Sequence, residues 1–252
     1  MKQYLTNTRT YLLVALLCCY LSGMAQEKKR LLVFSKTAGF YHKSIPVGKA
    51  AIQKLGLEHG FEVDTTTNAA HFTKENLQQY AAVVFLNTTG DVLNNEQQQI
   101  FEQFINNGKG FVGVHAATDT EYEWPWYGNL VGAYFSDHPE QQEATLKVLN
   151  QNTIATKHLP AEWKRKDEWY NFKWMTKENV NVLITIDETS YNAGKGKMGK
   201  THPMAWYHDF NGGRSFYTEL GHTDESYADP MYLQHLLGGI QYAMGLKKIQ
   251  AP

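Results

Sequence analysis

The sequence predicts a doubly wound α/β fold, in which helices cover both faces of a mostly parallel sheet. Two observations carry this prediction. Apolar runs alternate with helical patterns between residues 30 and 115, and those runs are apolar on both faces. Strands that are buried on both faces and joined by helices are typical of parallel sheets. The second half of the chain is less regular, so its strand order stays open.

Four segments predict strands in the first half, over residues 31–35, 61–65, 81–86 and 111–114, and the run over 81–86 is continuously apolar. Residues that favour helix starts lie between them. Ser44 begins a helix that runs to about Glu58. Thr73 begins a short helix, and Asn94 or Asn95 begins a third. This order of elements indicates a flavodoxin-like core.

The second half shows four further strand patterns, over residues 144–149, 180–186, 203–207 and 215–220, and a last helix that begins at Asp229. Residues 191–201 are predicted to form a flexible loop. Its glycines and lysines do not indicate a phosphate-binding loop, because no strand–turn–helix order surrounds them. No G-x-G-x-x-G follows the first strand either, so we expect neither nicotinamide nor flavin.

Residues 1–25 have the pattern of a secretory signal peptide. A basic start and an apolar run over residues 11–21 are followed by small residues, Gly23 and Ala25, at the cleavage positions. The alternative is an uncleaved anchor, but the run is short for a membrane span. We therefore expect residues 26–252 to form a single domain that is exported to the periplasm or secreted by a bacterium, with no membrane association after cleavage.

Both cysteines, Cys18 and Cys19, lie in the predicted signal peptide. The mature chain would then contain no disulfide, no thiolate metal site and no cysteine nucleophile. The sequence has 24 basic and 25 acidic residues, a net charge of −1. This balance, without a basic patch, argues against a nucleic-acid partner.

Three polar loops follow predicted strands, and each contains a histidine. His42 follows the first strand, His115 the fourth, and His222 the late strand over residues 215–220. In an open parallel α/β sheet, ligands bind at the carboxyl ends of the strands. We therefore expect these three histidines to share a site. Four other histidines are expected to be structural: His59, His71, His158 and His235.

The chemistry of such a site has two interpretations. Neutral imidazoles bind divalent metal ions, and Asp119, Glu219 or Glu225 could complete or orient the set. Alternatively, one histidine acts as a general base whose tautomer a carboxylate fixes. No HExxH-like spacing decides between them. A Ser–His–Asp hydrolase is disfavoured, because the sequence has no G-x-S-x-G turn.

Seven motifs carry a resemblance to a known family: LLVFSKTAGFYHKS (31–44), GFVGVHAATDTEYEWPWYG (110–128), VGAYFSDHP (131–139), DEWYNF (167–172), HPMAWYH (202–208), GGRSFYTELGHTDESY (212–227) and HLLGGIQYA (235–243). On these motifs the sequence resembles the ThuA-like (trehalose-utilisation) family, which shares the class I glutamine amidotransferase-like fold. In that fold a glycine and an aliphatic residue precede a catalytic cysteine, and His115 stands at the position of that cysteine. Amidotransferase activity is therefore not expected.

The resemblance implies a role in carbohydrate metabolism, in pathways where a sugar is oxidised to a 3-keto derivative. The expected ligand is a small carbohydrate, a disaccharide or 3-keto-sugar derivative, and the expected pathway partner is a separate sugar dehydrogenase. The positions that match the motifs are His42, His115, Asp119, His138, Glu168, His202 and His222.

From the loops and the motifs together, we assign roles to ten residues. The expected catalytic residues are His115, Asp119 and His222, and the expected ligands of a divalent metal ion are His42, His115 and His222. The expected substrate contacts are His42, Tyr41, Trp124, Glu168, Trp169, His202 and Glu225. Trp124 and Trp169 are chosen because sugar rings stack on aromatic faces, although both could equally be core residues. Trp126 and Tyr134 are expected in the core.

Three functions are compatible with these residues. The first is an exported sugar-processing enzyme, a hydrolase, lyase or isomerase. The second is a protein that binds a sugar without changing it. The third is a hydrolase of another substrate, such as an amide, on an amidotransferase-like scaffold.

Overall fold

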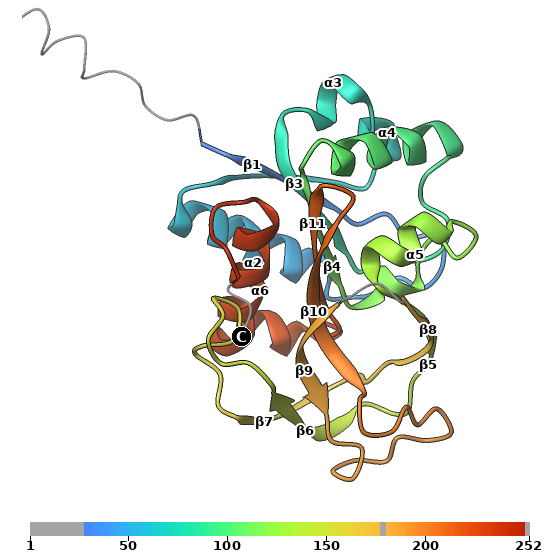
Figure 1. Cartoon of the computed structure of the whole chain (residues 1–252), viewed down its shortest axis with the longest axis vertical. Coiled ribbons are helices and arrows are strands. Elements are labelled where there is room, and N and C mark those ends of the chain that lie inside the picture. The colour runs from blue at the N-terminus through green and yellow to red at the C-terminus, as the bar shows by residue number, and fades with distance from the viewer. Residues whose placement is uncertain (1–27, 177–179, 250–252) are drawn as a thin grey trace, which may run out of the picture.

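A nine-stranded mixed sheet forms the centre of the molecule (Figure 1). The computed structural model describes residues 28–176 and 180–249. In sheet order the strands are β2 (Glu62–Thr66), β1 (Arg30–Phe34), β3 (Tyr80–Leu86), β4 (Gly110–Val114), β11 (Gly213–Thr218), β10 (Pro203–Phe210), β9 (Asn181–Ile186), β6 (Gln142–Val148) and β7 (Glu162–Asp167). The predicted α/β fold is confirmed.

The sheet has two halves of different character. The parallel half, β2-β1-β3-β4-β11, is parallel at every strand pair. The antiparallel half, β10-β9-β6-β7, joins it at β11 and is antiparallel throughout. A mostly parallel sheet was therefore the right expectation for the first half only. The difference follows from burial, because β4 is buried at every residue whereas β6 and β7 alternate between buried and exposed residues, as in a sheet with one solvated face.

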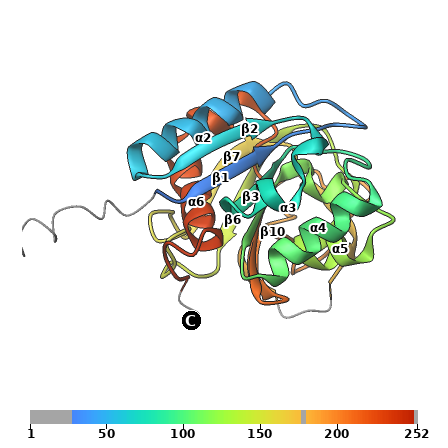
Figure 2. The same ribbon diagram turned by 90° about the horizontal axis from the view of Figure 1, so that it is seen from above.

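Helices cover both faces of the parallel half (Figure 2). On one face lie α2 (Ile45–His59) and α6 (Pro230–Ala243), and on the other lie α3 (Lys74–Leu77), α4 (Asn95–Asn106) and α5 (Pro125–Val131). A glycine lets α6 approach the sheet closely, because a Cβ on Gly239 would lie 2.3 Å from the ring of Phe216 on β11. The doubly wound arrangement thus holds where the strands are parallel.

The predicted helix starts are mostly confirmed. Asn94 caps α4 and forms a capping box with Gln97, Thr73 caps α3, and Asp229 caps α6. Helix α2 also begins directly after Ser44, as predicted, but the Ser44 side chain makes no capping bond. Its hydroxyl instead donates to the Gly221 carbonyl (3.3 Å) and accepts from Asn87 (3.1 Å), so it joins two loops behind the sheet edge.

Several elements were not predicted. A second, two-stranded antiparallel sheet pairs β5 (Ala133–Asp137) with β8 (Asn171–Met175). Strand β7, helix α5 and the short helices η1 (Ala69–His71), η2 (His115–Asp119) and η3 (Asp224–Ala228) are also additional. Residues 191–201 contain no helix or strand, as expected of a loop. The predicted signal peptide lies outside the described residues, within which no helix has the length and apolar character needed to cross a membrane.

Candidate metal centre

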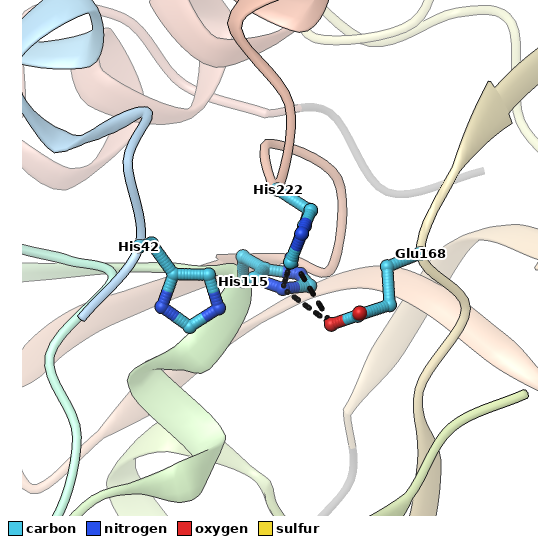
Figure 3. A group of neighbouring side chains, drawn as sticks. All are labelled: His42, His115, Glu168 and His222. Carbon is cyan, nitrogen blue, oxygen red and sulfur yellow. Dashed lines mark hydrogen bonds and ion pairs between the residues drawn. The ribbon is translucent and has the colours of Figure 1, made fainter. Parts of the chain in front are cut away.

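Four side chains from four separate loops meet at one edge of the sheet (Figure 3). His42 follows β1, His115 follows β4 and His222 lies beyond β11, so the three histidines predicted to share a site do meet. Glu168, the first residue after β7, joins them from the antiparallel half. One ligand atom from each of the four residues lies within 4.8 Å of the other three.

Three of these atoms form a compact triangle. His115 Nε2 is 3.1 Å from His222 Nδ1 and 3.4 Å from Glu168 Oε2, and the last two atoms are 3.0 Å apart. Metal–ligand bonds of about 2.1 Å in tetrahedral geometry place the ligand atoms about 3.4 Å apart. The triangle is therefore close to one face of a metal tetrahedron.

The structure fixes which nitrogen His115 presents. Its Nδ1 lies 2.7 Å from the carbonyl oxygen of Glu219, which can only accept a hydrogen bond. Nδ1 therefore carries the hydrogen, and Nε2 faces the cluster, the arrangement found for most histidines that bind metal. His115 also has a φ of +47°, unusual for a residue with a side chain. The hydroxyl of Tyr217 donates to its carbonyl (2.8 Å) and helps to hold this turn.

His42 presents a neutral imidazole ring to the cluster. Its side chain is buried, and among the described residues its Nδ1 has no hydrogen-bond partner. Burial and the nearby rings of His115 and His222 lower the pKa of His42 to about 2, so the ring is neutral. In Figure 3 Nδ1 is turned away from the other three side chains and the second ring nitrogen, Nε2, faces them, so Nε2 is the atom that His42 offers to the cluster.

Unlike His42, His115 lies in surroundings that favour its protonated form. Burial alone would lower the pKa of His115, but its interactions with Glu168 and Glu219 raise that pKa to about 10. Burial works against the Glu168 carboxylate, yet His115 and His222 hold the pKa of Glu168 below its usual value. Burial raises the pKa of Glu219, behind His115, to about 7. A divalent cation that binds the cluster would displace the proton that His115 holds.

A cavity of about 350 Å³ opens beside the cluster. Its lining residues are Phe40, His42, Asp119, Phe135, His138, Gln141, Glu168, Tyr170 and His222. His115 is fully buried and is not among them. It can therefore act on a ligand in the cavity only through its neighbours, which disfavours its predicted role as a general base.

Asp119 is the predicted catalytic residue that faces the cavity without joining the cluster. The Tyr122 hydroxyl donates to its Oδ1 at 2.6 Å. Burial raises the pKa of Asp119, although Tyr122 and Lys173 act in the opposite direction. Two predicted substrate contacts lie outside this cavity: Tyr41 is exposed and does not line it, and Glu225 is exposed on η3.

Three other predicted substrate contacts prove to be buried structural residues. Trp169 is fully buried, and its indole donates to the Gln142 carbonyl (2.9 Å). Trp124 is 8% exposed and donates to Glu102 (3.0 Å) while it stacks on Trp126. His202 is fully buried, with its ring nitrogens at Glu188 (3.0 Å) and the Tyr170 carbonyl (2.7 Å). A sugar cannot stack on rings whose faces the protein already covers.

The cavity instead uses residues that have no predicted role. The ring of Tyr170 lies 4.2 Å from those of His115 and Phe135, measured between centroids. His138 Nδ1 lies 3.2 Å from Glu168 Oε1. A signal existed, since these residues belong to the motif stretches 131–139 and 167–172, but nothing in the stretches says which aromatic residue is exposed. The four histidines expected to be structural, and the core residues Trp126 and Tyr134, lie outside the cluster.

Residues 30–243 match the ThuA family, described as "Trehalose utilisation". The chain belongs to the ThuA family. Among curated proteins, nothing matches it.

Solved structures show the same fold as this ThuA-family chain. A ThuA-like protein from Bacteroides uniformis has a TM-score of 0.75 and 24% identity, over 90% of this chain and 96% of that one. One from Parabacteroides merdae has a TM-score of 0.73 and 20% identity, over 90% and 94%. A β-galactosidase from Bacillus circulans matches at a TM-score of 0.56 and 13% identity, over 87% of this chain and 31% of that one. At such identities the likeness shows the fold alone.

Proposed function

We propose that this ThuA-family protein holds a divalent metal ion with His42, His115, His222 and Glu168 and processes a keto-sugar glycoside in the adjoining cavity. The observation that carries the proposal is the placement of four ligand atoms within 4.8 Å of one another beside that cavity. Three imidazole nitrogens and one carboxylate suit zinc and related first-row ions. The triangle of His115 Nε2, His222 Nδ1 and Glu168 Oε2 supports the fit, because its sides of 3.1, 3.4 and 3.0 Å are close to the edges of a metal tetrahedron.

A keto-sugar suits this donor set for a chemical reason, and the family description supports a carbohydrate role. A carbonyl group makes the C–H bonds beside it acidic. A bound metal ion would supply Lewis-acid stabilisation of the negative charge that develops on the carbonyl oxygen. The remaining requirement is a base in the cavity that is not itself a ligand.

Asp119 meets that requirement. It lines the cavity, Tyr122 fixes one of its carboxylate oxygens, and burial makes it a stronger base than an exposed aspartate. Asp119 takes the proton from the carbon beside the carbonyl. The freed electron pair forms a carbon–carbon double bond as the glycosidic C–O bond breaks, and the departing oxygen takes a proton from water. His115 and His222 act as ligands in this scheme, and His138 orients Glu168.

The test uses methyl 3-keto-glucoside and the metal-loaded protein. Wild type should release methanol and leave an unsaturated ketone, whereas hydrolysis would leave the free keto-sugar. Asp119→Asn should slow release by about 10²- to 10⁴-fold without changing the metal content. His71→Ala is the matched control, because His71 is an exposed histidine outside the cluster.

The runner-up is a sugar-binding protein without catalysis, and the mixed aromatic and polar lining of the cavity supports it. Calorimetry on the same samples separates the two. Binding of the keto-glucoside with no methanol release, even with metal bound, would favour the runner-up. If the protein neither binds the keto-glucoside nor releases methanol, both the enzyme and the sugar-binding proposals fail.

We further infer that the protein is exported, which the pattern of residues 1–25 supports. The mature protein recovered from the cell exterior should then begin at Gln26. The strand order β2-β1-β3-β4-β11 supports assigning the core to the flavodoxin-like, glutamine amidotransferase-like folds. Because a keto-sugar must be made by oxidation and this sequence has no nicotinamide fingerprint, we assign that step to a separate sugar dehydrogenase.

A further inference from the structure

An exposed aromatic side chain, Phe40, stands at the rim of the cavity. It is 65% exposed, yet it is one of the lining residues, and its ring meets His42 edge-on at 4.9 Å between centroids. Single exposed aromatic residues are common on protein surfaces and usually need no explanation. The position of Phe40 and the hydrogen bonds that hold its backbone distinguish it from such residues.

The backbone that carries Phe40 is bound tightly to a buried threonine. Thr89 is fully buried, and its carbonyl accepts from the Ala38 amide at 2.7 Å. Its hydroxyl accepts from the Gly39 amide (3.2 Å) and donates to the Phe40 carbonyl (2.9 Å). Three successive residues are thus fixed to one anchor. A backbone held in this way loses little further freedom when a ligand stacks on the side chain that it carries.

The rest of the rim is polar but carries no cation. Gln141 and His138 are exposed and line the same cavity as Phe40. Among the described residues that line the cavity, none is lysine or arginine, whereas Asp119 and Glu168 are acidic. Away from the proposed metal ligands, the described lining thus has one acidic side chain, Asp119, and no lysine or arginine, so this part of the cavity disfavours a phosphate or carboxylate group on the sugar. It suits neutral rings, which stack by their C–H faces and offer hydroxyls to polar groups.

The size of the cavity limits what fits beside the cluster. Its volume of about 350 Å³ lies near the lower end of the usual range for ligand pockets, about 300 to 1,000 Å³. A glycoside whose reacting ring lies beside the cluster would therefore extend its second group toward the rim.

We propose that Phe40 forms an outer subsite that binds the departing group of a neutral glycoside. Its ring stacks on that group while the reacting keto-sugar ring occupies the cavity beside the metal ligands. The inference rests on the proposed function and deepens it, because it gives the substrate two rings and assigns a different part of the site to each.

Two substrates with the same reacting ring test the subsite. Methyl 3-keto-glucoside has no second ring, whereas 4-nitrophenyl 3-keto-glucoside has one. Leaving-group chemistry alone favours the nitrophenyl compound, so the quantity of interest is the ratio of kcat/KM for the two substrates, compared between wild type and variants. Phe40→Ala should lower this ratio by about three- to tenfold, the usual worth of an aromatic contact. Phe40→Tyr should keep it, and Tyr41→Ala, an exposed neighbour that does not line the cavity, is the matched control.

The outcomes separate the subsite from the function on which it depends. A damaged fold lowers both kcat/KM values together and leaves the ratio unchanged, so calorimetric binding of each glycoside by folded Phe40→Ala is the second measurement. An unchanged ratio together with unchanged relative affinities would overturn the outer subsite while the proposed function stands. If wild type neither binds nor converts methyl 3-keto-glucoside, the proposed function itself fails.

Discussion

The two halves of the sheet build one site in different ways. The parallel half supplies three histidines from loops at the carboxyl ends of β1, β4 and β11. The antiparallel half, with the small β5-β8 sheet beside it, supplies Glu168 and four other residues of the cavity wall: Phe135, His138, Gln141 and Tyr170. The fold class alone brings the histidines together. The antiparallel half adds the negative charge, the aromatic wall and the polar rim that make the cluster a candidate reaction site.

One buried carboxylate joins the two contributions. Asp167, the last residue of β7, is fully buried. Its Oδ1 accepts from the Glu168 amide at 3.1 Å, and its Oδ2 accepts from the Gly221 amide at 3.2 Å. The two amides belong to Glu168 and to the residue before His222. Asp167 therefore sets the distance between a ligand from the antiparallel half and one from the parallel half.

The largest effect is expected from removing a metal ligand that the parallel half supplies. His115→Ala removes the ligand whose tautomer the Glu219 carbonyl fixes. Metal content measured by mass spectrometry should fall from about one ion per chain to less than a tenth of that, and methanol release should fall by more than about 100-fold. His71→Ala should retain both. A His115→Ala protein that stays folded by circular dichroism and keeps a full complement of metal would contradict the proposed centre.

The next largest effect is expected from changing Asp167, which links the two halves of the sheet. Asp167→Asn removes a charge that holds two ligand-bearing segments, so the metal dissociation constant should rise by about 10- to 100-fold. Competition with a chelator measures it, on samples shown to be folded. Asp187→Asn is the matched control, because Asp187 also lies in the antiparallel half but pairs with Lys147 at the surface. Equal metal affinities for the two variants would show that Asp167 acts on stability only.

The same division explains how much the sequence could predict. The strands of the parallel half are continuous apolar runs, and ligand groups in such a sheet gather at the carboxyl ends of its strands, so His42, His115 and His222 could be assigned to one edge. Strand β7 (EWKRKD) alternates polar residues with two buried ones and has no such run, so its end at Glu168 could not be placed. The resemblance drew attention to Glu168, but pairing across the antiparallel half decides where it lies.

The aromatic residues mark the limit of sequence interpretation more sharply. Trp124, Phe135, Trp169 and Tyr170 all lie within the motif stretches, and all four could stack on a sugar. Which ones face the cavity depends on long-range packing. Trp169 donates to a carbonyl on β6, while Tyr170, the next residue, turns toward His115. No local pattern distinguishes two such neighbours.

The smallest effects sharpen this comparison by exchanging one aromatic residue in each region. Trp124→Phe removes the hydrogen bond to Glu102 and part of a buried ring, so the free energy of unfolding should fall by about 1 to 2 kcal/mol with kcat/KM unchanged. Phe135→Leu takes a ring from the cavity wall, where it faces Tyr170, and should raise KM by about threefold with a smaller loss of stability. Urea unfolding gives the free energy of unfolding of each variant, and steady-state kinetics gives its kcat and KM. If Trp124→Phe raised KM as much as Phe135→Leu did, the covered tryptophan would have to contact substrate in some other conformation, and the division between a structural and a binding aromatic set would fail.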